Sequence, residues 1–303
     1  GGRALVPEVF DGRLLGKDFG RIRPPHDVFM GLGGMMVGRG ELPALLHPFA
    51  SIANFRTATA ILLRYFKDRL SYERGTRLLM GNALVARLFY SLRKRNIPVE
   101  FNTALVDLVL EGSAVVGAEV SGPEGRRVVR ARRGVVLATG GIGWNKSLRE
   151  KLFPRGAPAE SLAPECNTGD GVAAGLRAGA QLDDGHDSAA LWMPCSTMVN
   201  PNGSRSVWPH IILDRAKPGL IAVGRDGRRF VNESDSYHDF CMGMFRVNVD
   251  EAWLICDASF VRDYGIGLVL AGTRNLRRFI AAGYLTEAAS LAALGRKLGI
   301  DAE

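Results

Sequence analysis

The sequence has few of the residues that staple small domains or bind metal ions. Its 303 residues include four cysteines and five histidines. No cysteines form a C-x-x-C pair, and no histidines stand at H-E-x-x-H spacing. We therefore expect reduced thiols in a cytoplasmic protein, without a disulfide framework or a zinc site. The acidic stretch DDGHD at residues 183–187 is interpreted as a solvated hinge rather than a metal site.

Long apolar runs are also missing. No run approaches the ~18 residues that a transmembrane helix requires, and the first residues lack a basic-then-apolar signal pattern. The chain does not begin with Met, so we expect a piece of a longer protein. The net charge of +8 is spread over short basic groups without interleaved aromatic residues. Nucleic-acid binding is therefore not predicted.

The remaining composition is that of a globular α/β protein of roughly two domains, with 47% hydrophobic and 23% charged residues. Helical spacing of apolar residues predicts helices over residues 45–70 and 82–95. Alternation with glycine and proline turns predicts an antiparallel meander over residues 104–132 and a buried strand over residues 135–138. Further predicted elements are a hairpin at residues 219–231, a strand at 252–256, and helices at 258–264, 273–282 and 286–298.

Two glycine turns lie close together in residues 134–171. The predicted strand ends at Thr139-Gly140-Gly141, and Thr168-Gly169-Asp170-Gly171 opens a helix. Glycine turns at strand and helix ends let the backbone approach a flat, phosphate-bearing cofactor, although a single one is often a plain tight connection. A carboxylate repels phosphate, so Asp170 fits better as an acceptor for ribityl or ribose hydroxyls. FAD is a nucleotide cofactor with such a polyol.

The chain resembles the flavoprotein family that joins fumarate reductase and succinate dehydrogenase flavoprotein subunits to the 3-oxosteroid 1-dehydrogenases. Five segments carry this resemblance over nearly the whole chain. They are RGTRLLMGNALVARL (74–88), NTALVDLVLEGSAVVGAEV (102–120), RRGVVLATGGIGWN (132–145), NTGDG (167–171) and GRRFVNESDSYHDF (227–240).

The resemblance implies where FAD would lie. Backbone groups at Leu105 would contact the adenine, and Asp170 would contact FAD. The turns that would surround the cofactor consist of Thr139, Gly140, Gly141, Asn167, Thr168, Gly169 and Asp170.

Family members begin with a βαβ unit that carries G-x-G-x-x-G for the pyrophosphate and end with a glycine-rich segment over the flavin. Neither is found in this chain. We therefore expect a fragment that binds FAD weakly or not at all by itself. The expected organisation is a partial FAD-binding domain over residues 1–188 and a smaller α/β capping domain over residues 189–303.

The resemblance places catalysis in the capping domain. In the steroid dehydrogenases the base is a tyrosine four residues after the glutamate of the R-R-F-V-N-E motif. In this chain that glutamate is Glu233 and that tyrosine is Tyr237. In fumarate reductases an arginine three residues after the glutamate donates a proton, and that position is Ser236. A tyrosine of ordinary pKa ~10 needs a stabilised phenolate to act as a base, and His238 and Arg229 are nearby in sequence. Tyr237 as a packed aromatic residue, and Glu233 as a structural carboxylate, are the alternatives.

The resemblance thus implies an FAD-dependent enzyme that dehydrogenates a carbon–carbon bond next to a ketone. The implied partners are a small apolar ketone, such as a 3-ketosteroid, and an electron acceptor. One alternative is fumarate-reductase-like reduction of an unsaturated carboxylate, with Arg205, Arg215 or Arg246 as the acid. The other is a flavin-free binding or scaffold module.

Overall fold

The structure is a computed structural model that describes residues 5–25, 30–154, 157, 161–183, 185–186, 188–211 and 214–300. The chain forms two compact units, Gly1–Phe101 and Asn102–Glu303. The domain boundary expected between residues 188 and 189 falls inside the second unit. The two domains that it would separate stay a prediction. Both units mix helices with small sheets, as expected for an α/β chain.

The first unit is mainly helical. Its 3-10 helices are η1 (Gly12–Arg21), η3 (Arg39–Glu41) and η4 (Pro48–Ala50), and its α-helices are α1 (Leu42–Leu46), α2 (Ile52–Arg69) and α3 (Met80–Lys94). Its strands β1 (Phe10–Asp11), β2 (Met30–Gly31), β3 (Met35–Met36) and β4 (Arg77–Leu78) are short, and they pair as β1 with β4 and β2 with β3.

The core of the first unit lies between η1 and α3. Leu15 and Leu78 are completely buried there, and Ala83 and Ala86 let α3 approach closely. The Asp11 side chain accepts a hydrogen bond from the Arg13 backbone and caps η1. Asp11 and Gly12 thus begin a helix.

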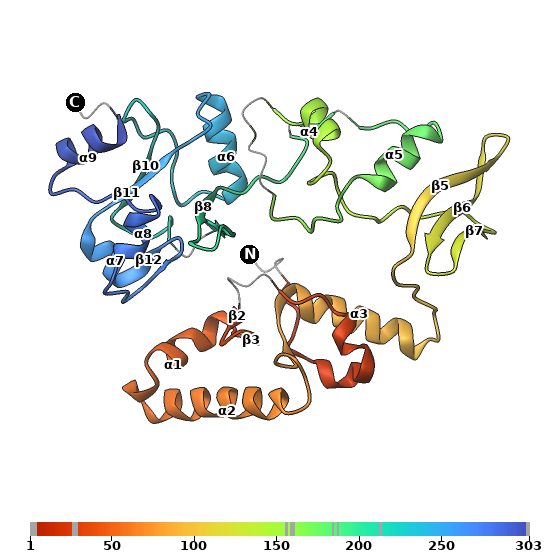
Figure 1. Cartoon of the computed structure of the whole chain (residues 1–303), viewed down its shortest axis with the longest axis horizontal. Helices are drawn as coiled ribbons and strands as arrows, with labels where there is room; N and C mark the ends of the chain where they lie inside the picture. Colours follow the sequence, from red (N-terminus) through yellow and green to blue (C-terminus); the bar gives the residue numbers. More distant parts are fainter. Residues whose placement is uncertain are drawn as a thin grey trace. The chain divides into compact units, whose positions relative to one another are not determined.

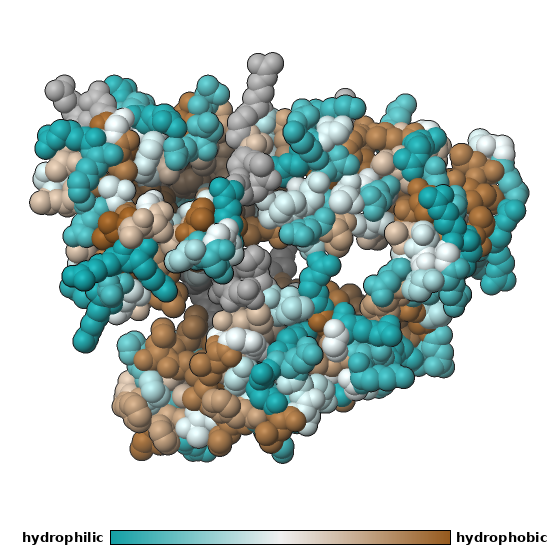
Figure 2. Space-filling model, viewed as in Figure 1, coloured by the Kyte–Doolittle hydropathy of each residue, from teal (hydrophilic) through white to brown (hydrophobic). Residues whose placement is uncertain are grey.

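Large apolar side chains are exposed on and beside α1 and α2. Figure 2 shows hydrophobic side chains gathered over this part of the chain. Phe49, Ile52 and Leu70 are more than 80% exposed. The predicted helix over residues 45–70 is correct for its larger part, since α2 begins at Ile52 with Ser51 as its N-cap.

The second unit begins with the predicted meander. Strands β5 (Ala104–Glu111), β6 (Ala114–Gly122) and β7 (Gly125–Arg130) pair antiparallel in that order (Figure 1). Helices α4 (Lys146–Leu152) and α5 (Asp170–Arg177) follow. The expected strand at residues 135–138 is wrong: no described strand pairs with it, and Val136 is 90% exposed. An extended apolar segment becomes a strand only where a neighbour accepts its backbone hydrogen bonds.

The rest of the second unit is a small α/β body. Its strands are β8 (Cys195–Val199), β9 (Arg205–Pro209), β10 (Leu220–Val223), β11 (Trp253–Cys256), β12 (Gly265–Ile266) and β13 (Val269–Leu270). Its helices are α6 (Tyr237–Arg246), α7 (Ala258–Tyr264), α8 (Arg277–Ala281) and α9 (Leu291–Leu298). The predicted hairpin at residues 219–231 is reduced to one bridge between Val223 and Arg229, because β10 pairs with β11 instead. A core around Phe260, Val269 and Phe279 holds this body together.

Candidate functional site

The two glycine turns meet in the folded chain. The Gly171 backbone N–H donates a hydrogen bond of 3.1 Å to the Thr139 hydroxyl. The Trp144 N–H donates to the Asn167 carbonyl at 3.0 Å, and the Asn145 side-chain amide donates to the Thr168 carbonyl at 2.7 Å. Residues 139–145 and 167–171 therefore form one connected structure, as the expected cofactor site requires.

The glycines in these turns have different reasons to be glycine. Gly140 has a φ of 86°, and a Cβ there would lie 2.5 Å from the Asn167 side-chain oxygen. Gly169 is the left-handed N-cap residue directly before α5. At Gly141, by contrast, nothing lies within 4 Å of the position that a Cβ would occupy. Gly141 leaves open space beside the backbone, which is where a ligand would approach.

Asp170 stands at the start of α5 with one oxygen in use. The Thr168 hydroxyl donates to its Oδ1 at 2.8 Å. Within the part of the chain that the structure describes, its Oδ2 accepts no hydrogen bond, and the residue is exposed. The carboxylate is therefore free to accept from a hydroxyl group, which matches the role expected for it.

Leu105 lies on β5, one of the two edge strands of the meander. A register irregularity follows it between Leu105 and Asp107. Arg177, the last residue of α5, donates to the Asp107 carboxylate at 3.0 Å and to the Val106 carbonyl at 3.1 Å. This clamp holds β5 beside the helix that Asp170 begins, so all the residues expected to contact FAD belong to one connected region.

These residues fit FAD. The open backbone at Gly141 suits a flat dinucleotide, and the free oxygen of Asp170 suits a polyol hydroxyl. The edge of β5 offers backbone groups to a base. Thr139, Gly140, Gly141, Asn167, Thr168, Gly169, Asp170 and Leu105 are therefore the residues of this chain that could hold the cofactor.

Tyr237 is the first residue of α6. The Ser236 side chain caps this helix by accepting from the Asp239 N–H at 3.1 Å. Tyr237 is half-buried, and its hydroxyl has no hydrogen-bond partner among the residues described. A helix N-terminus carries partial positive charge, which favours negative charge nearby. Ser236, at the position of the fumarate-reductase arginine, serves here as the cap.

Glu233 is 4% exposed and its carboxylate is fully engaged. It accepts two hydrogen bonds from Arg229 Nε, at 2.9 and 3.1 Å, and one from Nη2 at 2.5 Å. The Ala222 N–H donates to it at 2.8 Å. Burial raises the pKa of Glu233, but the bonds from Arg229 and Ala222 outweigh this effect and leave the pKa below its usual range. Such a carboxylate is suited to holding structure; its expected catalytic role stays a prediction.

The two groups expected to assist Tyr237 are directed elsewhere. Arg229 forms the pair with Glu233. The His238 Nδ1 accepts from the Trp192 backbone N–H at 3.2 Å. Trp192 also packs edge-to-face on Phe153 and Phe245, with centroids 4.8 and 5.2 Å apart. His238 and Trp192 thus anchor α6, and among the described residues neither forms a hydrogen bond with the Tyr237 hydroxyl.

A buried hydrogen-bond chain in this body was not suggested by the sequence. His210 Nδ1 lies 2.7 Å from the Asp214 Oδ2, and its Nε2 lies 2.8 Å from the Ser196 hydroxyl. The Ser196 hydroxyl is 2.6 Å from the Tyr284 hydroxyl, which accepts from the Leu268 N–H at 2.9 Å. These residues are up to 88 positions apart, so only the fold reveals them.

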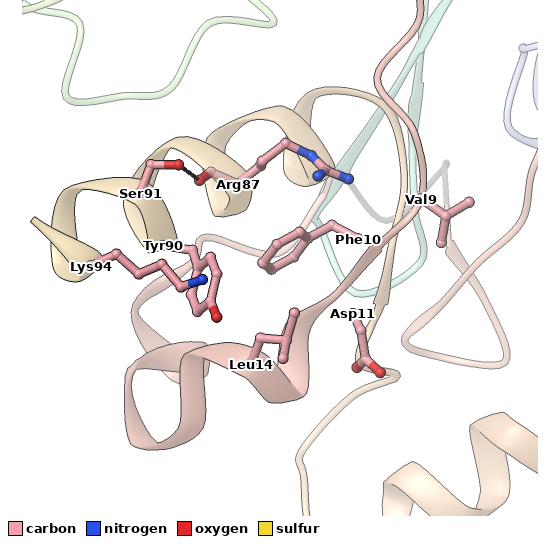
Figure 3. Close-up of a pocket in the computed structure, with 8 residues that line it drawn as sticks. All are labelled: Val9, Phe10, Asp11, Leu14, Arg87, Tyr90, Ser91 and Lys94. Atoms are coloured by element: carbon pink, nitrogen blue, oxygen red, sulfur yellow. Dashed lines mark hydrogen bonds between the residues drawn. The ribbon is translucent and has the colours of Figure 1, made fainter.

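The first unit has an open groove of about 540 Å³ formed by β1, η1 and α3 (Figure 3). Lys94 lies over the Tyr90 ring at 4.9 Å and Arg87 over the Phe10 ring at 5.5 Å. These cations are engaged by aromatic faces of their own unit. None of the residues predicted for the site lines this groove.

No group of three or more metal-ligating side chains occurs among the described residues. His186 pairs with Asp183 at 3.1 Å, while Asp184 and Asp187 lie outside the described part. No described helix is both long and apolar enough to cross a bilayer.

Comparison with known proteins shows the family of the chain. A family model described as FAD binding domain matches residues 2–289. The chain is 32% identical over 310 residues to 4-oxocyclohex-2-ene-1-carboxylate 5-dehydrogenase of Sinomonas cyclohexanicum, covering 100% of this chain and 52% of the relative. It is 31% identical over 320 residues to 3-oxosteroid 1-dehydrogenase of Mycolicibacterium smegmatis, covering 100% and 54%.

A solved structure is similar over the same extent. It is the 3-ketosteroid delta1-dehydrogenase of Sterolibacterium denitrificans in complex with 1,4-androstadiene-3,17-dione. The TM-score is 0.82 with 29% identity, over 100% of this chain and 55% of the other. The chain thus spans about half the length of the relatives it matches. The expected fold, a partial FAD-binding domain of mixed α/β type, is confirmed, and the chain belongs to the FAD binding domain family of flavoproteins.

Proposed function

We propose that the protein containing this chain is an FAD-dependent dehydrogenase that removes two hydrogens from adjacent carbons next to a ketone. The observation that carries the proposal is Tyr237, which starts a capped helix with an uncommitted hydroxyl. Homology to dehydrogenases that act on ring ketones supports it. The connected glycine turns supply part of the cofactor site that the reaction requires.

Tyr237 is the residue that takes the proton. The hydrogen on the carbon next to a carbonyl is acidic, and the phenolate oxygen of Tyr237 is the base that removes it. FAD, when bound, supplies the acceptor for the hydride from the neighbouring carbon. The start of α6 favours the negative charge that a basic phenol oxygen carries.

The two glycine turns and Asp170 set where the cofactor lies, and therefore where that chemistry occurs. Gly140 and Gly141 allow the backbone to approach the dinucleotide, and Asp170 accepts from its polyol. Asn145 and Arg177 tie these turns to α4 and β5. These hydrogen bonds would keep the turns in place when the cofactor binds.

The substrate class follows from what the similar enzymes share. One is named for a 3-oxosteroid and another for a 4-oxocyclohexene carboxylate, and both names describe a ketone. We infer that a cyclic ketone with a saturated carbon pair beside the carbonyl is oxidised. Reduction of an unsaturated dicarboxylate is disfavoured, because Ser236 stands where fumarate reductases carry an arginine.

The full-length flavoprotein tests this function directly. A 3-oxosteroid and 4-oxocyclohexanecarboxylate should each be added to the oxidised enzyme under anaerobic conditions, where a substrate bleaches the flavin absorbance. Fumarate should then be added to the reduced enzyme to test whether it reoxidises the flavin. Tyr237→Phe should lower kcat about 10²- to 10⁴-fold, the usual size of a general-base effect, with the flavin still bound. Normal turnover in Tyr237→Phe would show that another residue is the base. The proposed reaction is contradicted if neither ketone bleaches the flavin, or if fumarate rapidly reoxidises the reduced flavin.

A further inference from the structure

The orientation of Tyr237 depends on how the start of α6 is held. Its hydroxyl has no described hydrogen-bond partner, so the backbone at the start of α6 and the packing around the half-buried ring set where the hydroxyl lies. Proton abstraction is sensitive to this direction, since a misplacement of about 1 Å can lower a rate about 100-fold. The groups that fix residues 233–240 are therefore relevant to catalysis.

Arg215 contacts the chain on both sides of Tyr237. Its Nη1 donates a short hydrogen bond to the Glu233 carbonyl, four residues before the tyrosine. Its guanidinium lies 5.1 Å from the centre of the Phe240 ring, three residues after it. Phe240 is 2% exposed and packs on Phe230 at 5.5 Å. A single planar cation thus brackets the first turn of α6.

Arg215 is itself buried and held through Nε and Nη1, while its Nη2 has no hydrogen-bond partner among the described residues. It is 1% exposed, and its Nε donates to the His210 carbonyl at 2.8 Å. Burial lowers the pKa of Arg215, and the neighbouring Asp214 carboxylate opposes that effect. Asp214 accepts from the Arg215 N–H at 2.8 Å and from the Gly267 N–H at 2.9 Å.

The partly buried hydrogen-bond chain holds Asp214 in turn. The Asp214 carboxylate can only accept, so His210 Nδ1 donates to it. In a neutral imidazole Nε2 then accepts from the Ser196 hydroxyl, and the Ser196 oxygen accepts from the Tyr284 hydroxyl. The Tyr284 oxygen accepts from the Leu268 N–H. The arrangement resembles an activated serine, but the Tyr284 hydroxyl donates to the Ser196 oxygen and opposes its use as a nucleophile.

We propose that Arg215 is a positioning residue for Tyr237, held in place by Asp214 and His210. The inference rests on the proposed function, because it assigns Arg215 an effect on the base of that reaction. Lysine at this position keeps the charge but loses the planar fork that reaches Glu233 and His210 together.

A double-mutant cycle in the full-length flavoprotein tests the proposal. Arg215→Lys should lower kcat about 10- to 100-fold, with KM changed less than about threefold, and should shift the pH profile of kcat/KM. In a Tyr237→Phe background the same substitution should have little further effect, because it acts through the tyrosine. Arg225→Lys is the matched control: its guanidinium is exposed and pairs with Glu251 at 2.8 Å.

The outcomes separate the two proposals. If Arg215→Lys slows the Tyr237→Phe enzyme by the same factor as the wild type, the positioning role is wrong and the proposed base stands. If Tyr237→Phe turns over normally, both are wrong. A second readout does not need turnover: in cofactor-free protein with ¹³C-labelled tyrosine, Arg215→Lys should shift the ring resonance of Tyr237, identified by its loss in Tyr237→Phe. An unmoved resonance would contradict positioning by Arg215.

Discussion

The Thr139 hydroxyl accepts a hydrogen bond from the Gly171 N–H at 3.1 Å, across 32 positions of the chain. This bond joins the turn at the end of residues 135–138 to the turn that begins α5. Gly171 has no room for a side chain, because a Cβ there would overlap the same hydroxyl. The hydroxyl of Thr139 and the absent side chain of Gly171 therefore both allow the two turns to lie close together.

Replacing Thr139 by Val should loosen this junction. The substitution keeps the shape and removes the acceptor, so we expect a loss of about 1 kcal/mol in unfolding free energy and weaker FAD binding in the full-length protein. Thermal unfolding and flavin fluorescence titration measure the two effects. Thr139→Ser retains the acceptor and should behave like the wild type; an equal loss in both variants would contradict the role of the bond.

Gly140 and Gly141 should respond differently to alanine. At Gly140 the positive φ and the contact with Asn167 make alanine destabilising by about 1–3 kcal/mol. At Gly141 there is open space, so Gly141→Ala should change stability by less than about 0.5 kcal/mol yet weaken FAD binding about tenfold or more, equivalent to about 1.4 kcal/mol. Unchanged FAD affinity in Gly141→Ala would show that the cofactor does not approach there.

Glu233→Gln should destabilise the second unit in a pH-dependent way. The pKa of Glu233 is depressed in the folded protein, so its ionised form contributes stability above its unfolded pKa, near 4.5. That contribution is lost as pH falls through the lower folded pKa. We expect a difference of about 2 kcal/mol between wild type and variant at pH 7, shrinking below pH about 4.5. Urea unfolding across pH measures it, with the exposed Glu251→Gln as the control; a difference that grows toward acid would oppose this assignment.

The four thiols should fall into two classes. Burial raises the pKa of Cys241 to about 12 and that of Cys256 to about 11, whereas Cys166 and Cys195 are exposed. A thiol-alkylating reagent at pH 8 should therefore modify two cysteines quickly and the others only after unfolding. Mass spectrometry of the native protein counts them. Rapid labelling of Cys241 would contradict its burial. The cytoplasmic location inferred from cysteine usage stays a prediction.

The 303-residue chain by itself should bind FAD weakly or not at all, because it carries no G-x-G-x-x-G cradle for the pyrophosphate. Isothermal titration of the purified chain with FAD checks this. A yellow protein that retains stoichiometric FAD through gel filtration would overturn it.

Several elements followed from local sequence because neighbours along the chain satisfy them. The meander forms where alternation and turns predict it, and α7 spans the predicted residues 258–264. The glycine turns and the motif around Tyr237 also pointed to the correct family. In the meander, each strand pairs with the next strand along the chain.

Tertiary structure decided the rest. Residues 135–138 have strand-like composition but no described partner strand, and the second strand of the hairpin at residues 219–231 lost its place to β11. Glu233, whose catalytic role stays a prediction, is a buried ion-pair partner because folding brings Ala222 and Arg229 to its oxygens. Composition and motifs by themselves determined the family and the position of the tyrosine. The contacts of Arg215, which we propose positions that tyrosine, exist only in the folded chain, where residues 210, 233 and 240 surround its buried guanidinium.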